Sequence, residues 1–242
     1  MIKIENYEVV GWEHAVRGMR NPMNSWAKSD SDFKGAAVTH ILENDKPKEQ
    51  HVYFDALSIG PNDHDLMMRL AKGGSVHAKY RRMITVYVDI TAPLYWWKEF
   101  DTYKVGTVAN SCSTMHKLTE KEFTIDDFSC EHLYIENTLI LEEIVKQLNV
   151  YRYAYIHGVD ETDSYSGEHI NIDPNDKGVW WQMIQLLPSS YNQKRTVMLN
   201  YEVLTNIYNS RRNHKLDEWE DLCDWIETLP YSEIIIGDVN DE

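Results

Sequence analysis

The chain has 242 residues, of which 43% are hydrophobic and 26% charged, so it is long enough and apolar enough to bury a substantial core. Its net charge of -15 argues against a protein that coats nucleic acid through a basic surface, and the sequence contains neither a membrane-spanning apolar run nor the apolar core of a signal peptide. The three cysteines, Cys112, Cys130 and Cys223, lack CxxC spacing, and we therefore expect a reduced, cytoplasmic protein.

The first predicted elements are two helices separated by a strand. A helix is predicted at 63–72, because leucine and methionine recur there at helical spacing before two glycines. A strand is predicted at 83–90, where the sequence MITVYVDI is β-branched and alternates. Pro93 then opens a helix through an aromatic block, since proline suits the first turn of a helix.

The C-terminal half is predicted to be largely helical. Amphipathic patterns predict helices at 138–150, 197–209 and 216–228. Two polar stretches, at 42–50 and 160–177, each fit either a mobile lid or a plain solvated connection. A solvated connection is the more common of these two cases. This order of elements indicates an α+β fold in which helices outnumber strands.

The signatures of several common enzyme classes are absent from the sequence. No P-loop, GxGxxG, GxSxG or HExxH occurs. The histidines His157, His169 and His214 are not at metal-ligand spacing with the cysteines, so no metal site is predicted. Cys112, in NSCST, fits either a nucleophile or a small inert hydrophobe, and a lone cysteine is more often the second.

Residues 98–118, KEFDTYKVGTVANSCSTMHKL, combine lysines with many small polar side chains directly after Trp96 and Trp97. This segment and the residues before it resemble the fingerprint of the flavin-dependent thymidylate synthases, in which APxF…RQ precedes RHRxxSxNxxSxR. Ala92-Pro93 match the family, and Lys98-Glu99 stands at its Arg-Gln. Thr102-Tyr103-Lys104 stands at its Arg-His-Arg, and Thr107 stands at its first serine. If one inserted residue is allowed, Asn110 stands at its asparagine, Ser113 at its second serine and Met115 at its last arginine.

Three further elements resemble the same family and follow its order along most of the chain. VHAKYRRM at 76–83 corresponds to GHETPFEH and places His77 at the flavin-binding histidine. AVRGMRNPMNSW is similar to the family's VRAAR and aligns Arg17 or Arg20 with its arginine. The segment 187–219 resembles LP…N…N…R…H…W. Its matched residues are Pro188, Asn200, Asn206 and Arg211, followed by His214 and Trp219.

The resemblance implies the fold and the activity of that family. It implies a single α+β domain over residues 1–242, with helices outnumbering a small central sheet. The implied reaction is methylation at C5 of dUMP, or a related pyrimidine deoxynucleotide, with methylenetetrahydrofolate as carbon donor and reduced FAD, recharged by NADPH, as hydride source. The flavin carries the chemistry, so no cysteine nucleophile is required. The implied assembly is a homo-oligomer, a tetramer in the family, with sites shared between subunits and with neither membrane nor nucleic acid as partner.

The resemblance also implies roles for individual residues. Cofactor contacts are implied for His77, Thr102, Tyr103, Lys104, Asn110, Ser113, Asn200, Asn206 and His214. Substrate contacts are implied for Lys98, Glu99, Ser111, Cys112, Ser113, Thr114, Gln185 and Arg211. Such contacts suit flat, anionic ligands, which need apolar walls, amides and hydroxyls, and a few cations for phosphates.

The chain departs from the family mainly at its arginines. The fingerprint arginines are replaced, and Ile184, beside Gln185, stands where the family has another arginine before LP. Lysine lacks the bidentate fork of arginine, so the geometry of anion recognition must change. Residues that could bind the anion in their place are Lys98, Lys104, His116, Lys117 and Arg212.

Plainer interpretations remain open for each of these residues. Asn200 and Asn206 fit helix capping or solvent exposure; on a helix at 197–209 they share no narrow face with Arg211, unless the helix ends near residue 209. His77 fits an inert, hydrogen-bonded histidine, and Arg211 fits a charge that closes a helix. The tryptophans at 96, 97, 180 and 181 fit core positions better than flavin platforms. For the whole chain, the alternatives are a divergent homologue that binds flavin or nucleotide for another reaction or for regulation, and a structural homologue without a cofactor.

Overall fold

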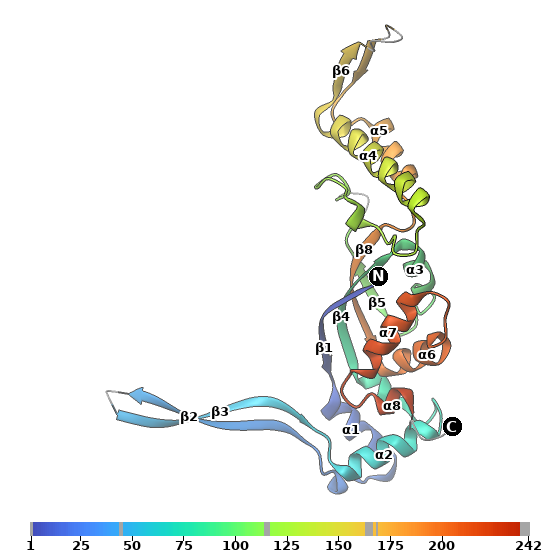
Figure 1. Ribbon diagram of the computed structural model, residues 1–242. Coiled ribbons are helices and arrows are strands. Elements are labelled where there is room, and N and C mark those ends of the chain that lie inside the picture. The colour runs from blue at the N-terminus through green and yellow to red at the C-terminus, as the bar shows by residue number, and fades with distance from the viewer. Residues whose placement is uncertain (1, 44–45, 114–116, 163–166, 168, 238–242) are drawn as a thin grey trace. The chain divides into compact units, whose positions relative to one another are not determined.

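The computed structural model describes residues 2–43, 46–113, 117–162, 167 and 169–237 (Figure 1). The chain divides into two compact units. Unit 1 contains Met1–Glu5, Asp89–Thr102 and Ala109–Thr196, and unit 2 contains Asn6–Val88, Tyr103–Val108 and Val197–Glu242. The single domain over residues 1–242 stays a prediction.

The largest sheet has four strands in the order β1-β4-β8-β5. Their bounds are Lys3–Val10 for β1, Thr85–Pro93 for β4, Asn192–Asn200 for β8 and Val108–Ser111 for β5. Along β4, buried residues alternate with more exposed ones, and Val86, Val88 and Ile90 belong to the core. This two-residue period is the one expected for a strand with one buried face, and it confirms the strand predicted from the sequence.

Unit 2 is mainly helical. It contains α1 (Trp12–Arg20), α2 (Pro61–Lys72), α6 (Tyr201–Arg211), α7 (Asp217–Glu227) and α8 (Glu233–Ile236), with short 3-10 helices that include η3 (Lys79–Met83). Strands β2 (Asp32–Glu43) and β3 (Lys46–Ser58) pair antiparallel in a two-stranded sheet. Helix α2 confirms the predicted helix: it starts at a proline and ends before Gly73.

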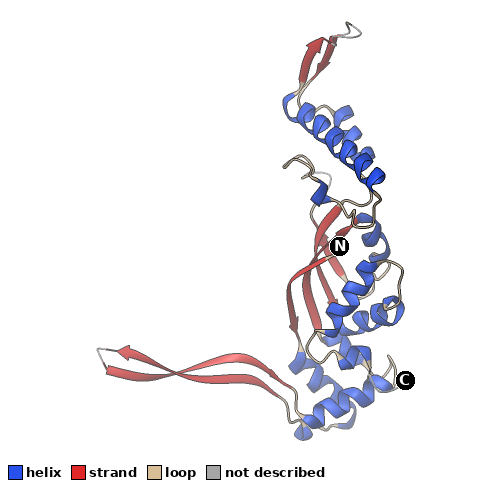
Figure 2. Ribbon diagram, in the orientation of Figure 1, coloured by secondary structure: helices blue, strands red, loops and turns tan. Residues whose placement is uncertain are grey.

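Unit 1 carries α3 (Leu94–Phe100), α4 (Ile135–His157) and α5 (Lys177–Leu186), and a small antiparallel pair of β6 (Val159–Thr162) and β7 (His169–Ile172). Helices α4 and α5 pack side by side (Figure 2). Their shared core contains Phe123, Phe128, Leu141, Leu148 and Met183. Asp176 caps α5, because its Oδ1 accepts a hydrogen bond from the Val179 amide at 2.9 Å.

The mixture of helices with small sheets confirms the α+β class, and three of the predicted elements need correction. The helix predicted at 197–209 is wrong at its start, because residues 197–200 end strand β8 and α6 begins only after Asn200. The polar stretch at 42–50 belongs to β2 and β3 apart from residues 44–45, which lie outside the described residues. The stretch at 160–177 contains most of β6, all of β7 and the start of α5, with residues 163–166 and 168 again outside.

No helix in the described part of the chain combines the length and the apolar composition that crossing a bilayer would require.

Candidate functional site

A cluster in unit 2 joins residues from two distant parts of the sequence. Arg211 Nε donates a hydrogen bond to the Tyr103 hydroxyl at 2.9 Å, across 108 positions of the chain. The Arg211 guanidinium lies 4.6 Å from the centre of the buried Trp219 ring, and the His214 ring lies 6.2 Å from the same ring. Three predicted site residues, Tyr103, Arg211 and His214, are therefore brought together around one tryptophan.

The end of α6 positions this cluster. Arg211 is the last residue of α6, and Trp219 lies in the first turn of α7, so the packing of these two helices holds the guanidinium over the ring. The next residue, Arg212, has a different role: it forms ion pairs with Asp224 at 2.5 Å and Glu227 at 3.2 Å. Arg212 is thus the charged residue that links the end of α6 to α7, whereas Arg211 packs on aromatic rings.

The loop after Tyr103 lies against the start of α6. Asn200 is the N-cap residue of α6, and its Oδ1 accepts a hydrogen bond from the Val203 amide at 3.1 Å, as the capping interpretation predicted. Gly106 has a φ of 79°, and a Cβ there would lie 3.0 Å from Asn200 Nδ2, so the approach requires glycine. The hydroxyl of the following Thr107 is buried and has no hydrogen-bond partner among the described residues.

His77 lines a separate cavity of unit 2. The His77 side chain is exposed and lies close to Gly73. A Cβ placed on Gly73 would be 3.2 Å from the Cβ and the Cδ2 of His77. The cavity has a volume of about 640 Å³, and its wall includes Met19, Leu66 and Tyr80. Its size and its largely apolar lining are typical of pockets that take a small organic ligand.

The predicted site residues of unit 1 lie on several elements. Asn110 and Ser111 are exposed on β5, and the exposed Cys112 follows them, its carbonyl accepting a hydrogen bond from Gln193 Nε2 at 2.9 Å. Ser113 is half-buried, Thr102 donates a hydrogen bond to the carbonyl of Glu99, and Thr114 lies outside the described residues, as do Met115 and His116.

Other predicted residues are not brought together. Lys98 is exposed on α3 and Gln185 is exposed on α5, and within the described ranges no hydrogen bond or ion pair joins either one to another site residue. In unit 2, Lys104 and Asn206 are likewise exposed.

Arg195 is a cation beside the fingerprint segment that the sequence did not single out. Its guanidinium carbon lies 4.2 Å from the centre of the Trp97 ring, and it donates hydrogen bonds to Gln193 Oε1 at 3.0 Å and Asp101 Oδ1 at 2.7 Å. Trp97 Nε1 in turn donates to the Gln193 carbonyl at 2.9 Å. The signal available in the sequence was the alternation along β8, which places residues 193 and 195 on one face.

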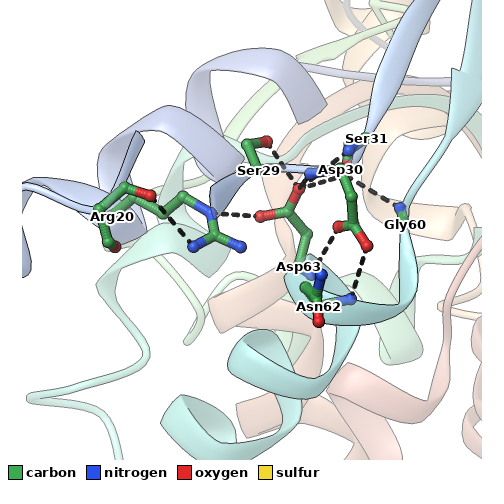
Figure 3. A network of polar contacts seen from close by, with 8 residues as sticks. Arg20, Ser29, Asp30, Ser31, Gly60, Asn62 and Asp63 are labelled. Atoms are coloured by element: carbon green, nitrogen blue, oxygen red, sulfur yellow. Dashed lines mark hydrogen bonds and ion pairs between the residues drawn. The ribbon is translucent and has the colours of Figure 1, made fainter. Parts of the chain in front are cut away.

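The two candidate early arginines, Arg17 and Arg20, differ sharply in exposure. Figure 3 shows the polar network around Arg20. Arg20 is buried, and its Nε donates a hydrogen bond to the buried Asp63 carboxylate at 2.5 Å. Burial would raise the pKa of Asp63, but hydrogen bonds from Ser31, Ser29 and Arg20 outweigh it and hold the pKa below the ordinary value of 3.8. Arg17 is exposed on α1, so Arg20 is committed to the fold and Arg17 faces solvent.

Other titratable groups offer little further chemistry. Burial raises the pKa of the Cys223 thiol to about 11, so this cysteine is not a thiolate at neutral pH. Within the residues that the structure describes, no group of three histidine, cysteine or acidic side chains is arranged to hold a metal ion.

No protein-family model matches the chain, and no curated protein matches it by sequence. Solved structures do match it. One is the flavin-dependent thymidylate synthase ThyX from Helicobacter pylori complexed with FAD and dUMP, with a TM-score of 0.60 and 15% identity over 96% of this chain and 95% of that chain. A second structure of that synthase with FAD and dUMP gives a TM-score of 0.59 and 16% identity over 96% and 94% of the two chains. The described chain therefore has a fold like that of the ThyX synthases.

Proposed function

We propose that this protein is a flavin-dependent enzyme of the thymidylate synthase type, which binds FAD and methylates dUMP or a related pyrimidine deoxynucleotide at C5. The observation that carries the proposal is the cluster of Tyr103, Arg211, His214 and Trp219. The fingerprint supplies the first of these residues and the C-terminal element supplies the others. Two separate sequence matches therefore lie next to each other in space, and the fold is like that of an enzyme complexed with FAD and dUMP. These two observations together support a common function.

The residues of unit 2 fit a flavin. The cavity beside His77 offers the apolar wall that a ring system needs. The buried Thr107 hydroxyl lacks a partner among the described residues, and a ligand atom near it would remove the cost of leaving it unpaired. When bound, FAD would supply the hydride, with NADPH as reductant and methylenetetrahydrofolate as carbon donor. The proposed cofactor contacts are His77, Thr102, Tyr103, Lys104, Asn110, Ser113, Asn200, Asn206 and His214.

Arg211 is the proposed anchor for the nucleotide. The Tyr103 hydroxyl and the Trp219 ring fix the direction of its guanidinium, so little side-chain entropy remains to be lost when an anion binds. A charge-assisted hydrogen bond to a phosphate or a pyrimidine carbonyl is the contact that this group makes best. The other proposed substrate contacts are Lys98, Glu99, Ser111, Cys112, Ser113, Thr114 and Gln185.

One experiment separates the proposal from its alternatives. The purified protein is expected to carry a flavin absorption band and to transfer a methyl group to dUMP when methylenetetrahydrofolate and NADPH are supplied. A flavin band without methyl transfer to dUMP would instead support a divergent homologue that uses flavin for another reaction or for regulation. Failure to bind added FAD at micromolar concentration would refute both of these flavin-dependent functions.

The second candidate, the divergent homologue, is favoured by one observation. Thr102-Tyr103-Lys104 stands where the family has Arg-His-Arg, and the Tyr103 hydroxyl here accepts a hydrogen bond from Arg211. A change of this kind in the fingerprint alters how an anion is recognised. Testing other pyrimidine nucleotides alongside dUMP in the same methyl-transfer assay distinguishes a changed substrate from a lost reaction.

A further inference from the structure

Unit 1 contains a groove of about 680 Å³, lined by α4 and β6, which follow each other in the chain (Figure 1). One face of α4 forms its first wall, through Lys146, Asn149, Val150, Tyr153 and Ala154. On this wall Val150 is 57% exposed and Tyr153 is 61% exposed. Four consecutive residues, 158–161, form a second wall, so the groove follows the backbone of β6.

Two residues hold these walls in place. Asn149 Oδ1 accepts a hydrogen bond from the Phe123 amide at 2.8 Å, and its Nδ2 donates to the Phe123 carbonyl at 2.9 Å. This double contact fixes the buried Phe123 and so places the neighbouring Glu122 at the edge of the groove. Gly158 follows the last residue of α4 with a φ of 72°, and a Cβ there would lie 2.6 Å from the Ile172 carbonyl oxygen. Glycine is therefore required for β6 to start directly after the helix.

The charged residues of the groove are mostly acidic. Three exposed carboxylates line it, those of Glu122, Asp160 and Glu161. Its one lysine, Lys146, donates a hydrogen bond through Nζ to Glu143 Oε1 at 2.6 Å, so its charge is already paired. Asp160 Oδ1 lies 3.3 Å from His169 Nε2, whereas neither Glu122 nor Glu161 forms an ion pair within the described residues. The groove therefore favours a cationic ligand over an anionic one.

We propose that this groove binds an extended basic segment of a partner protein, with arginine or lysine at alternate positions. The long stem of such a side chain is apolar and packs on Val150 and Ala154, while its charge reaches Glu122 or Glu161. The exposed Tyr153 ring offers a face for a guanidinium. Alternate side chains of an extended segment point to the same side, so two cations enter the groove together. This inference does not depend on the binding of flavin or nucleotide.

Strand β6 explains why the occupant is a peptide segment. It pairs with β7 in a two-stranded sheet, so among the described residues its other edge has no strand beside it. An unpaired edge offers backbone donors and acceptors to an extended chain, and a small amine has no backbone to use them. A second copy of this chain is disfavoured at an acidic groove, because each copy carries a net charge of -15.

The first test is calorimetry of the full chain with the peptide acetyl-Thr-Arg-Thr-Arg-Thr-amide. Binding is expected, and it should weaken as salt is added, because exposed charges are screened. Two other probes are expected to bind about tenfold or more weakly: the same peptide with glutamate in place of arginine, and spermidine, which is cationic but has no peptide backbone. No binding of the arginine peptide would overturn the proposal. Equally tight binding of spermidine would overturn it in favour of a small organic cation.

The second test uses two double variants with the same change in charge. Glu122→Lys with Glu161→Lys is expected to weaken binding of the arginine peptide about tenfold or more and to bind the glutamate peptide instead. Glu136→Lys with Glu142→Lys changes two exposed positions of α4 outside the groove and is expected to have a much smaller effect. Equal losses in the two double variants would assign binding to the net charge of the protein and contradict the proposal.

The third test concerns the ring of Tyr153. Tyr153→Ala is expected to weaken binding of the arginine peptide roughly two- to fivefold, and Tyr153→Phe, which keeps a ring face, is expected to retain it. The control is Tyr134→Ala, which removes a 79% exposed ring at the N-cap of α4, outside the groove. Equal losses in Tyr153→Ala and Tyr134→Ala, or no loss in Tyr153→Ala, would contradict the placement of the guanidinium on this ring.

Discussion

Replacing Asp63 by asparagine tests the buried network that fixes the start of α2. Asp63 Oδ1 accepts from Arg20 Nε at 2.5 Å. Its Oδ2 accepts from the Ser29 and Ser31 hydroxyls at 2.7 Å and from the Asp30 and Ser31 amides at 3.0 and 3.1 Å. All of these partners are donors. An asparagine side chain has one oxygen and an amide nitrogen that is itself a donor, so either Arg20 or the donors on Oδ2 must lose their acceptor.

The expected cost follows from burial. Arg20 is 4% exposed and Asp63 is fully buried, so the variant leaves a buried guanidinium without its counter-charge. Removing one member of a buried ion pair costs about 3–5 kcal/mol. In a chain of this size, 1 kcal/mol corresponds to about 2–4 °C in melting temperature, which predicts a fall of roughly 6–20 °C.

The assay is thermal or urea unfolding, with Asp65→Asn as the matched control. Asp65 lies on the same helix, but it is exposed and forms an ion pair with Arg69 one turn away, so its loss should cost no more than about 1 kcal/mol. Because the pKa of Asp63 is lowered in the folded state, its contribution is complete above pH 3.8 and is lost as the pH falls through the lowered value. The gap between the protein and its Asp63→Asn variant should therefore narrow in acid. A folded variant with unchanged stability at neutral pH would refute this reasoning.

Three further changes probe the proposed site. Arg211→Ala is expected to weaken dUMP binding roughly tenfold to a hundredfold by calorimetry, because a charged hydrogen bond contributes about 1.5–3 kcal/mol. Its control is Arg212→Ala, which removes the ion pairs with Asp224 and Glu227 and the contact with the Tyr208 ring, and equal losses of dUMP affinity would contradict the assignment. Cys112→Ser should leave methyl transfer largely intact, since flavin chemistry needs no thiolate, and loss of activity in a folded variant would point to covalent catalysis. Asn200→Ala should cost about 0.5–2 kcal/mol of stability because it removes an N-cap, whereas Asn206→Ala, at an exposed position, should leave stability unchanged. The double variant should weaken FAD binding, and an unchanged FAD affinity would remove both residues from the cofactor site.

Helices and strands whose start and stop residues are encoded in their own local sequence were predictable. Helix α2 has its own start and stop, a proline in the first turn and a glycine after the last. The helix predicted at 197–209 failed because Val197 and Leu199 fit a helical period as well as a strand period, and both are buried in β8. The sequence did contain the boundary, since Asn200 is a preferred N-cap residue.

The two hairpins were missed for a different reason. Strands β2 with β3 and β6 with β7 pair through their backbones in separate two-stranded sheets. Backbone pairing leaves little trace in composition, and polar residues at 42–50 and 160–177 resemble a solvated connection. A polar strand differs from a polar loop in having a strand to pair with, and the local sequence does not show whether such a strand exists.

The candidate site likewise has one part that the sequence indicated and one part that only the structure shows. The family pattern assigned Tyr103 to the cofactor and Arg211 to the substrate without predicting that they touch, and the structure joins them by a hydrogen bond. The pattern leaves residue 106 unspecified, yet the structure requires glycine there, with a φ of 79° and Asn200 Nδ2 3.0 Å from the place of a Cβ. That close approach seats the loop on the N-terminus of α6 and is accompanied by burial of the Thr107 hydroxyl at the family's first serine position. The residue that lets the fingerprint meet the helix is thus one that no comparison of side-chain chemistry would select, because what it contributes is the absence of a side chain.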